Sequence, residues 1–172
     1  MNASIEMKPE NPEITLAGIG IIRSPFKEPT GMPIQPVFAE GAEGTVEVLP
    51  QYTEGLSDLE GFERLWLIYW LHKAPVGSLR VIPFRDTTER GVFATRVPCR
   101  PNAIGLSCVR LLSVAGNVLR INGVDILDGT PLLDIKPYIP KFDAFPNSRA
   151  GWCDRSLPSA PTHADNRFAV QP

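Results

Sequence analysis

The chain has 172 residues, a length that predicts a single domain. Its 17 lysines and arginines against 19 aspartates and glutamates give a net charge of −2, which excludes a histone-like or broadly basic nucleic-acid-binding protein but leaves room for a local basic site. The 18 prolines and 14 glycines are too many helix-breaking residues for a helical bundle, so a strand-rich domain with many turns is favoured.

The cysteines, histidines and apolar runs indicate a cytoplasmic protein. The three cysteines have no C-x-x-C spacing, which favours a reducing compartment, and with His72 and His163 as the only histidines a Cys/His zinc site lacks ligands. The N-terminus has no apolar signal-peptide core, and the longest apolar run, residues 65–71, is too short to cross a bilayer. We therefore expect a cytoplasmic chain without a bound metal or a membrane segment.

The first fifty residues predict two strands separated by a stiff loop. Residues 1–13 are polar and contain two prolines, so we expect a flexible leader. Residues 14–22 are rich in β-branched residues and glycine and predict a strand. Residues 25–36 carry four prolines, which suits neither a helix nor a central strand. Residues 43–49 alternate in the manner of a half-buried strand.

The middle of the chain predicts a short helix and further strands. A helix is expected within residues 52–61, followed by a strand over residues 63–72 that is apolar on both faces and should lie in the middle of the sheet. Residues 91–95 predict a short strand. Residues 104–114 and 118–121 are separated by an Ala-Gly-Asn turn, which predicts a hairpin.

Closely spaced turns continue to residue 140 and then give way to irregular chain. Asn-Gly and Asp-Gly turn signals precede strands predicted over residues 124–127 and 132–135. Short strands between close turns predict a mainly β fold, a single-sheet β-barrel of mostly antiparallel strands with short helices. The barrel is expected over residues 14–146, followed by an irregular, Pro- and Ser-rich C-terminal tail over residues 147–172.

Common nucleotide and nucleophile motifs are missing from the sequence. It contains neither a G-x-x-x-x-G-K-[ST] phosphate loop nor a G-x-S-x-G nucleophile elbow. Gly18 and Gly20 begin like a dinucleotide fingerprint, but Arg23 stands at the third glycine position, so turn glycines are the better interpretation. A nucleotide-like cofactor would therefore not bind in the Rossmann manner.

Two polar segments are richer in functional side chains than a structural loop needs. Between residues 80 and 110, six arginines stand against Asp86 and Glu89, a local charge of 6 − 2 = +4. Such a cluster predicts a surface for anions or an RNA backbone, or else a solvated face. The second segment contains Asp134, Lys136 and Tyr138, whose alternation places an acid, a cation and a phenol on one face of a strand. These side chains form either a functional site or an ion pair at the rim.

Four motifs in this order resemble the TrmO (TsaA-like) family of tRNA methyltransferases over residues 16–146. They are IGIIRSPFK at residues 19–27, GVFATR at 91–96, RPNAIGLS at 100–107, and DGTP followed by DIKPY at 128–138. The family uses S-adenosylmethionine to methylate N6 of threonylcarbamoyladenosine beside the anticodon of threonine tRNA. The resemblance implies a single-sheet β-barrel, a cofactor site unlike the Rossmann type, and a homodimer.

The resemblance implies where the cofactor lies, and the chemistry of the side chains leads to hypotheses for their individual roles. Arg96 would pair with the cofactor carboxylate, Asp128 would accept from ribose hydroxyls, and Leu106 would cover the adenine. Asp134 is the predicted acceptor of the N6 proton, with Tyr138 as the alternative. The full cofactor-binding set is Gln35, Pro36, Val37, His72, Lys73, Arg96, Leu106, Ile126, Leu127, Asp128, Gly129 and Thr130, and the predicted RNA-binding residues are Arg100, Asn102 and Lys136.

Some alternatives stay open. A lone histidine at a strand end, such as His72, is more often a structural residue than a catalyst. Ala103 replaces the second proline often seen after the R-P-N motif, which should loosen that loop. The same segments would also suit a non-enzymatic barrel that binds an adenine-type ligand or RNA.

Overall fold

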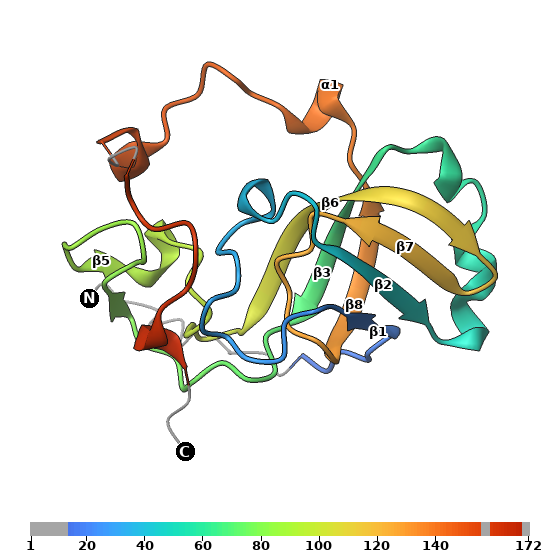
Figure 1. Ribbon diagram of the computed structural model, residues 1–172, viewed down its shortest axis with the longest axis horizontal. Helices are drawn as coiled ribbons and strands as arrows, with labels where there is room; N and C mark the ends of the chain where they lie inside the picture. Colours follow the sequence, from blue (N-terminus) through green and yellow to red (C-terminus); the bar gives the residue numbers. More distant parts are fainter. Residues whose placement is uncertain (1–13, 156–158, 170–172) are drawn as a thin grey trace, which may run out of the picture.

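A computed structural model describes residues 14–155 and 159–169, and its centre is a closed six-stranded barrel (Figure 1). The strand order is β1-β2-β7-β6-β3-β8, and every neighbouring pair is antiparallel, so the predicted barrel is confirmed. The predicted leader, residues 1–13, lies outside the described residues. The strands are β1 (Gly20–Arg23), β2 (Glu43–Val48), β3 (Arg64–Trp70), β6 (Ile104–Ala115), β7 (Val118–Asn122) and β8 (Thr130–Pro137).

The barrel closes around side chains that alternate along each strand. In β3, for example, Leu65, Leu67 and Tyr69 point inward and are buried, while Trp66 and Ile68 face outward. This alternation is what a closed sheet requires, because one face of every strand lines the same interior. β3 pairs with β6 and β8, but in a closed barrel every strand has two neighbours, so β3 holds no special central place. The fully buried interior includes Ile22, Val46, Leu65, Leu67, Val109, Leu119, Ile121 and Leu132.

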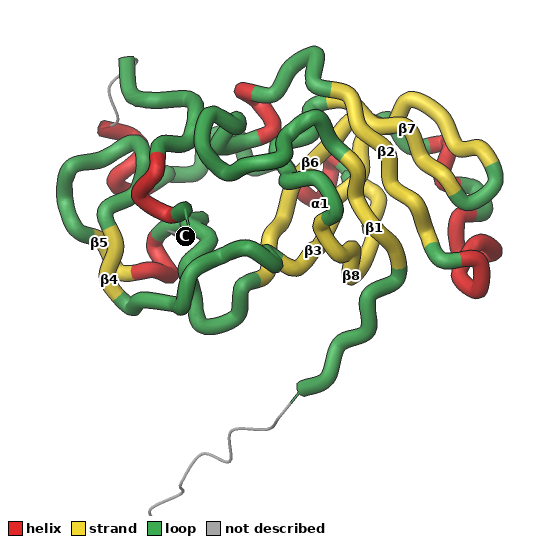
Figure 2. Tube along the Cα trace, turned by 60° about the horizontal axis from the view of Figure 1, so that its bottom comes forward, coloured by secondary structure: helices red, strands yellow, loops and turns green. Residues whose placement is uncertain are grey.

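A second, smaller body of chain, which we call the side lobe, comprises residues 71–103 between β3 and β6 (Figure 2). It contains the two-stranded pair β4 (Arg80–Val81) and β5 (Arg90–Gly91) and the 3₁₀ helix η4 (Val92–Ala94). Its own small core is Val81, Val92, Val97 and Cys99, with Phe168 packed against them.

The C-terminal part of the chain leaves the barrel and returns to the side lobe (Figure 1). It contains only short helical turns, so the predicted irregular character is confirmed for the described residues. No helix among residues 14–155 and 159–169 is long and apolar enough to cross a membrane. The turns are α1 (Pro140–Asp143), η5 (Gly151–Arg155) and η6 (Asn166–Phe168).

Two strand predictions were wrong. The predicted strand over residues 91–95 is mainly the 3₁₀ helix η4, because the Thr95 N–H bonds back to the Val92 carbonyl at 3.1 Å. The predicted strand over residues 124–127 is irregular, since Val124, Asp125 and Ile126 are buried in succession, whereas a barrel strand would alternate.

Two boundaries also differ from the predictions. The first strand begins at Gly20 rather than at residue 14. The predicted helix within residues 52–61 is two 3₁₀ helices, η2 (Pro50–Leu56) and η3 (Leu59–Gly61), separated where Asp58 adopts a left-handed φ of 64°. A remaining 3₁₀ turn, η1 (Pro36–Phe38), lies in the loop between β1 and β2.

Candidate functional site

Antiparallel pairing brings three separate segments to one end of the barrel. Ile22 near the end of β1 lies opposite Thr130 at the start of β8, and Leu132 of β8 lies opposite Tyr69 near the end of β3. The chain just beyond these strands therefore gathers at the same rim. We call this end the mouth, and it is formed by residues 23–27, 71–73 and 122–130.

Asp128 is the centre of one group of polar residues at the mouth. Its carboxylate pairs with Lys27 Nζ at 2.8 Å and accepts the Ser24 N–H at 3.1 Å, and both contacts hold the pKa of Asp128 below its usual value. Lys73 Nζ donates to the Lys27 carbonyl at 3.3 Å. The predicted cofactor residues Lys73 and Asp128 are therefore brought together, and Lys27 joins them.

His72 and Thr130 complete this group. Thr130 Oγ1 donates to the Leu127 carbonyl at 2.7 Å and lies 3.4 Å from His72 Nδ1. Partial burial of the imidazole and the neighbouring Lys73 charge lower the pKa of His72, which favours the neutral ring. Gly129 has a φ of 76°, a left-handed conformation that lets the chain turn sharply into β8.

A second group joins the side lobe to the loop before η1. Arg96 Nη1 donates to Gln35 Oε1 at 2.8 Å, which brings two predicted cofactor residues together across 61 positions of sequence. Arg100 Nη1 donates to the carbonyls of Thr95 (3.2 Å) and Val97 (3.4 Å), on either side of Arg96. The Arg100 side chain, predicted to bind RNA, thus holds the backbone that carries Arg96.

A buried polar network that the sequence did not predict lies beneath the mouth. Ser107 Oγ donates to Asp125 Oδ1 at 2.6 Å, and the Tyr69 hydroxyl lies 2.9 Å from the same Ser107 oxygen. Burial raises the pKa of Asp125 to about 6, against the opposing effects of the Ser107 hydrogen bond and of the Arg96 charge. A carboxylate placed within the apolar run 124–126 was the available signal, because burying a charge is costly.

Asp125 is expected to make the stability of the barrel depend on pH. Its pKa is higher folded than unfolded, so its stabilising effect is largest in acid and is lost as the pH rises through about 6. Between pH 5 and pH 7 this group should lower the unfolding free energy of the wild type by about 1 kcal/mol. Asp125→Asn should lack this decrease. Urea unfolding at both pH values measures this difference.

The exposed carboxylate Glu40 provides the control for that experiment. Glu40→Gln should keep the pH dependence of the wild type. An Asp125→Asn variant whose stability changes with pH just as the wild type does would show that this carboxylate is not shielded from water.

Other predicted residues lie on the outer face of the barrel or at its far end. Ile68 of β3 lies opposite Leu106 of β6 on one side and Asp134 of β8 on the other. All three side chains therefore share the outer face of the barrel. Lys136 Nζ pairs with Asp134 Oδ2 at 2.8 Å. This is the rim ion pair that the sequence offered as the alternative to a functional site. Tyr138 lies at the far end of β8, with its ring edge-on to Trp66 at 5.7 Å between centroids.

The remaining predicted cofactor residues differ widely in exposure. Val37 is exposed and Ile126 is buried, while Pro36, Leu127 and Gly129 are intermediate. Asn102 is exposed, and its carbonyl accepts the Ile104 N–H at 2.7 Å.

The six arginines of residues 80–110 do not form a surface of unpaired positive charges, because each of them has an intramolecular partner. Exposed ion pairs such as Arg80–Glu89 are weak, so these arginines can still exchange a partner for a phosphate. The partners are Glu89 for Arg80, Ala160 and Pro161 carbonyls for Arg85, Asp86 for Arg90, Gln35 for Arg96, Thr95 and Val97 carbonyls for Arg100, and Glu63 for Arg110.

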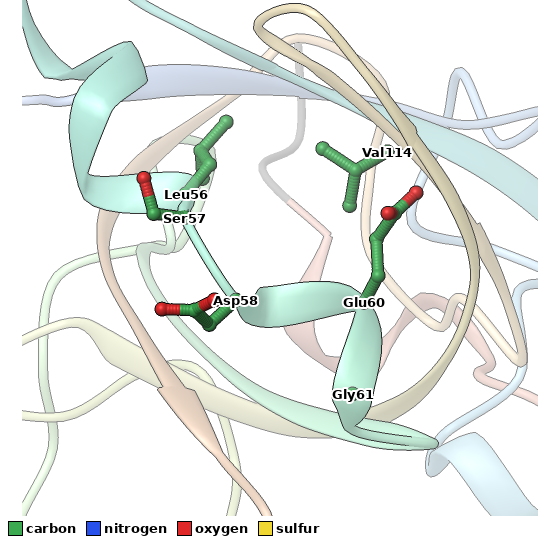
Figure 3. A pocket seen from close by; sticks show the side chains of 6 residues that line it. All are labelled: Leu56, Ser57, Asp58, Glu60, Gly61 and Val114. Atoms are coloured by element: carbon green, nitrogen blue, oxygen red, sulfur yellow. The ribbon is translucent and has the colours of Figure 1, made fainter.

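A hollow at the opposite end of the barrel contains none of the predicted site residues (Figure 3). Leu56 and Val114 line it together with Asp58 and Glu60, and Figure 3 shows these side chains around its rim. Within the described part of the chain, no three His, Cys, Asp or Glu side chains come together in a group that could hold a metal ion.

The mouth and the Arg96–Gln35 pair together suit a ligand that combines an amino acid with a nucleoside. The exposed Arg96 guanidinium is a donor for a carboxylate, whereas Asp128 is an acceptor for an ammonium or for hydroxyl groups. S-adenosylmethionine carries these groups, so the residues present fit this cofactor.

Comparison with known proteins places these residues in a wider context. The model of the family described as the tRNA-methyltransferase O N-terminal domain matches residues 21–144. A relative from Pyrococcus abyssi, named "Probable S-adenosyl-L-methionine-binding protein", is 56% identical over 139 residues, which cover 81% of this chain and 76% of the relative. The tRNA (adenine(37)-N6)-methyltransferase of Escherichia coli is 38% identical over 152 residues, which cover 83% of this chain and 64% of the relative.

A solved structure agrees with the barrel. The crystal structure of TrmO from Pseudomonas aeruginosa superposes with a TM-score of 0.73 at 42% sequence identity, covering 88% of this chain and 66% of that one. The chain therefore spans about two thirds of the length of these two bacterial relatives.

Proposed function

The chain belongs to the family of the tRNA-methyltransferase O N-terminal domain, and on this premise we propose that it transfers the methyl group of S-adenosylmethionine to N6 of an adenine in tRNA. The observation that carries the proposal is the gathering of His72, Asp128 and Thr130 at the mouth, with the Arg96–Gln35 pair near enough for the Arg96 charge to lower the pKa of Asp125, all inside the matched range. Relatives of this chain are named for S-adenosyl-L-methionine binding and for tRNA adenine-N6 methylation.

The cofactor would be held between the polar group at the mouth and the Arg96–Gln35 pair. S-adenosylmethionine supplies a methyl group already activated on a sulfonium. Arg96, steadied by Gln35, would bind its carboxylate, and Asp128 would accept from its ribose hydroxyls. The residues of the mouth would thereby orient the donor, which is where most of the rate of such a transfer originates.

The tRNA would approach the mouth from the solvent side. Lys27 and Lys73 are exposed there, and their ammonium groups would contact phosphates. The RNA-binding assignments of Arg100, Asn102 and Lys136 remain part of the proposal. Asp134 remains the proposed acceptor of the N6 proton, with Tyr138 as the alternative.

A more specific proposal names the modified adenine that is methylated and the cellular compartment of the reaction. The adenine would carry a threonylcarbamoyl group and stand beside the anticodon of threonine tRNA, and the reaction would take place in the cytoplasm. The motifs at residues 91–96, 100–107 and 128–138 support this choice through their resemblance to the family.

We propose a homodimer, which would explain an exposed apolar patch on the outer face of the barrel. Trp70, Ile104 and Leu106 are 43%, 38% and 51% exposed on neighbouring strands near the mouth end, and Leu106, a predicted cofactor residue, faces outward there. A second copy covering this face would bring Leu106 of one chain toward the mouth of the other.

Ile104→Asp is expected to convert this dimer to a monomer, because it places a charge in the covered face. Light scattering at micromolar concentration measures the mass of each variant. Leu16→Asp is the control, since Leu16 is exposed on the segment that precedes β1. A wild-type chain that is already a monomer would refute the dimer.

Nucleoside mass spectrometry tests the proposed activity. The protein is incubated with isotope-labelled S-adenosylmethionine and either tRNA that carries threonylcarbamoyladenosine or tRNA that lacks this modification. Labelled methyl on threonylcarbamoyladenosine alone would establish the finer proposal, whereas label on plain adenine would establish only the coarser one. Cofactor binding without any transfer would instead favour a non-enzymatic barrel that binds an adenine-type ligand.

A further inference from the structure

The proline-rich loop before η1 pairs with a part of the chain that is far away in sequence. Residues 31–34 form an antiparallel pair with residues 162–164: the Gly31 N–H donates to the Ala164 carbonyl at 2.8 Å, and the Ala164 N–H donates to the Met32 carbonyl at 2.8 Å. The Ile34 N–H donates to the Thr162 carbonyl at 3.0 Å. Gln35, the partner of Arg96, is the next residue along this loop.

The same C-terminal segment, residues 160–168, is also fixed to the side lobe. Phe168 packs on the small core of the lobe and meets the Phe84 ring edge-on at 5.0 Å between centroids. Arg167 Nη1 donates to the Pro83 carbonyl at 2.9 Å, and its guanidinium lies 5.3 Å from the Phe84 ring centroid. The side lobe is the part of the chain that carries Arg96.

Arg85 provides a third contact, between the pairing with residues 31–34 and the packing of Phe168 and Arg167 on the side lobe. Arg85 of the side lobe donates to the carbonyls of Ala160 and Pro161 at 3.3 and 3.2 Å. Its guanidinium also lies 5.3 Å from the ring centroid of Phe38, which ends η1. The C-terminal segment therefore contacts both the loop that carries Gln35 and the lobe that carries Arg96.

We infer that the C-terminal segment acts as an added strand that holds Gln35 against Arg96 and so completes the cofactor site. The inference rests on the proposed function, because it assigns cofactor binding to this pair. Gln35 and Arg96 lie outside the barrel strands, and neither is fixed by the barrel ladder. An added strand restricts the loop before the ligand arrives, and such preorganisation raises affinity without a new contact to the ligand.

Ala164→Pro tests this role, because proline lacks the N–H that donates to the Met32 carbonyl. We expect the dissociation constant for S-adenosylmethionine, measured by calorimetry, to rise about tenfold if the paired state falls to about a tenth of the population. Amide exchange at Gly31 and Ile34 should accelerate, while exchange within the barrel strands stays unchanged.

Ala160→Pro is the matched control. The Ala160 N–H has no hydrogen-bond partner among residues 14–155 and 159–169, and its carbonyl, which Arg85 uses, is retained in proline. Arg167→Ala releases the other anchor without adding a ring and should weaken binding by about threefold, which corresponds to the loss of roughly one net hydrogen bond. It serves as a second test should Ala164→Pro unfold.

The outcomes distinguish this inference from the proposed function. Wild-type affinity in both Ala164→Pro and Arg167→Ala would overturn the inference and leave the proposed function standing. A wild-type chain that binds no S-adenosylmethionine would overturn both. Weaker binding by Ala164→Pro than by Ala160→Pro, together with faster exchange at Gly31 and Ile34, would support the added strand.

Discussion

Replacing Arg96 by alanine is expected to weaken S-adenosylmethionine binding by one to two orders of magnitude while the barrel stays folded. Arg96 is exposed, and its side chain donates a hydrogen bond to Gln35 in a loop outside the barrel, so the barrel does not depend on it. A hydrogen bond between charged groups contributes about 1.5–3 kcal/mol, which corresponds to roughly 10- to 150-fold in affinity. Calorimetric titration with the cofactor measures the change.

Two controls make that result specific. Arg96→Lys keeps the charge but not the planar, two-pronged guanidinium, so its affinity should lie between those of the wild type and Arg96→Ala. Arg80→Ala removes another exposed arginine of the same lobe, paired with Glu89, and should bind normally. Unchanged affinity in Arg96→Ala would remove Arg96 from the cofactor site.

Gly105→Ala is expected to cause a large loss of stability. Gly105 is the register partner of Tyr69, whose ring lies directly over it and would overlap an added Cβ. The ring is buried and its hydroxyl is bonded to Ser107, so it cannot move without breaking the network that ends at Asp125. Overpacking of this kind costs about 3 kcal/mol, or roughly 6–12 °C in melting temperature for a chain of this size.

Gly91→Ala is the matched control for Gly105→Ala. A Cβ at Gly91 would contact nothing within 4 Å, and its φ of −62° is accessible to alanine. Its melting temperature should stay close to that of the wild type. Equal melting temperatures for Gly105→Ala and Gly91→Ala would mean that the Tyr69 ring is not fixed over Gly105.

The barrel strands were predictable because their signals are local. Alternation along residues 43–48 and the Ala-Gly-Asn turn between β6 and β7 are both visible in a short stretch of sequence. Residues 92–94 and 124–127 were not, because the first forms a helical turn inside a small core and the second is buried without being paired as a strand. In both places packing decides the backbone, and no local pattern reports it.

The candidate site was predictable only in part, and mainly through the resemblance to a family. Arg96, Asp128 and Thr130 were named from their motifs, and the structure gathers them with residues from other segments. Asp125 was missed because its role depends on Ser107, which reaches it from another strand. The pairing of residues 31–34 with residues 162–164 was missed because contacts across about 130 residues leave no local signature.

A crystal structure of the chain with S-adenosylmethionine provides the most direct test of the mouth as the cofactor site. We predict density for the cofactor at the mouth, with its carboxylate at Arg96 and its ribose at Asp128. Density only elsewhere, for example in the hollow beside Asp58 and Glu60, would contradict the site and with it the roles given to Gln35 and Arg96.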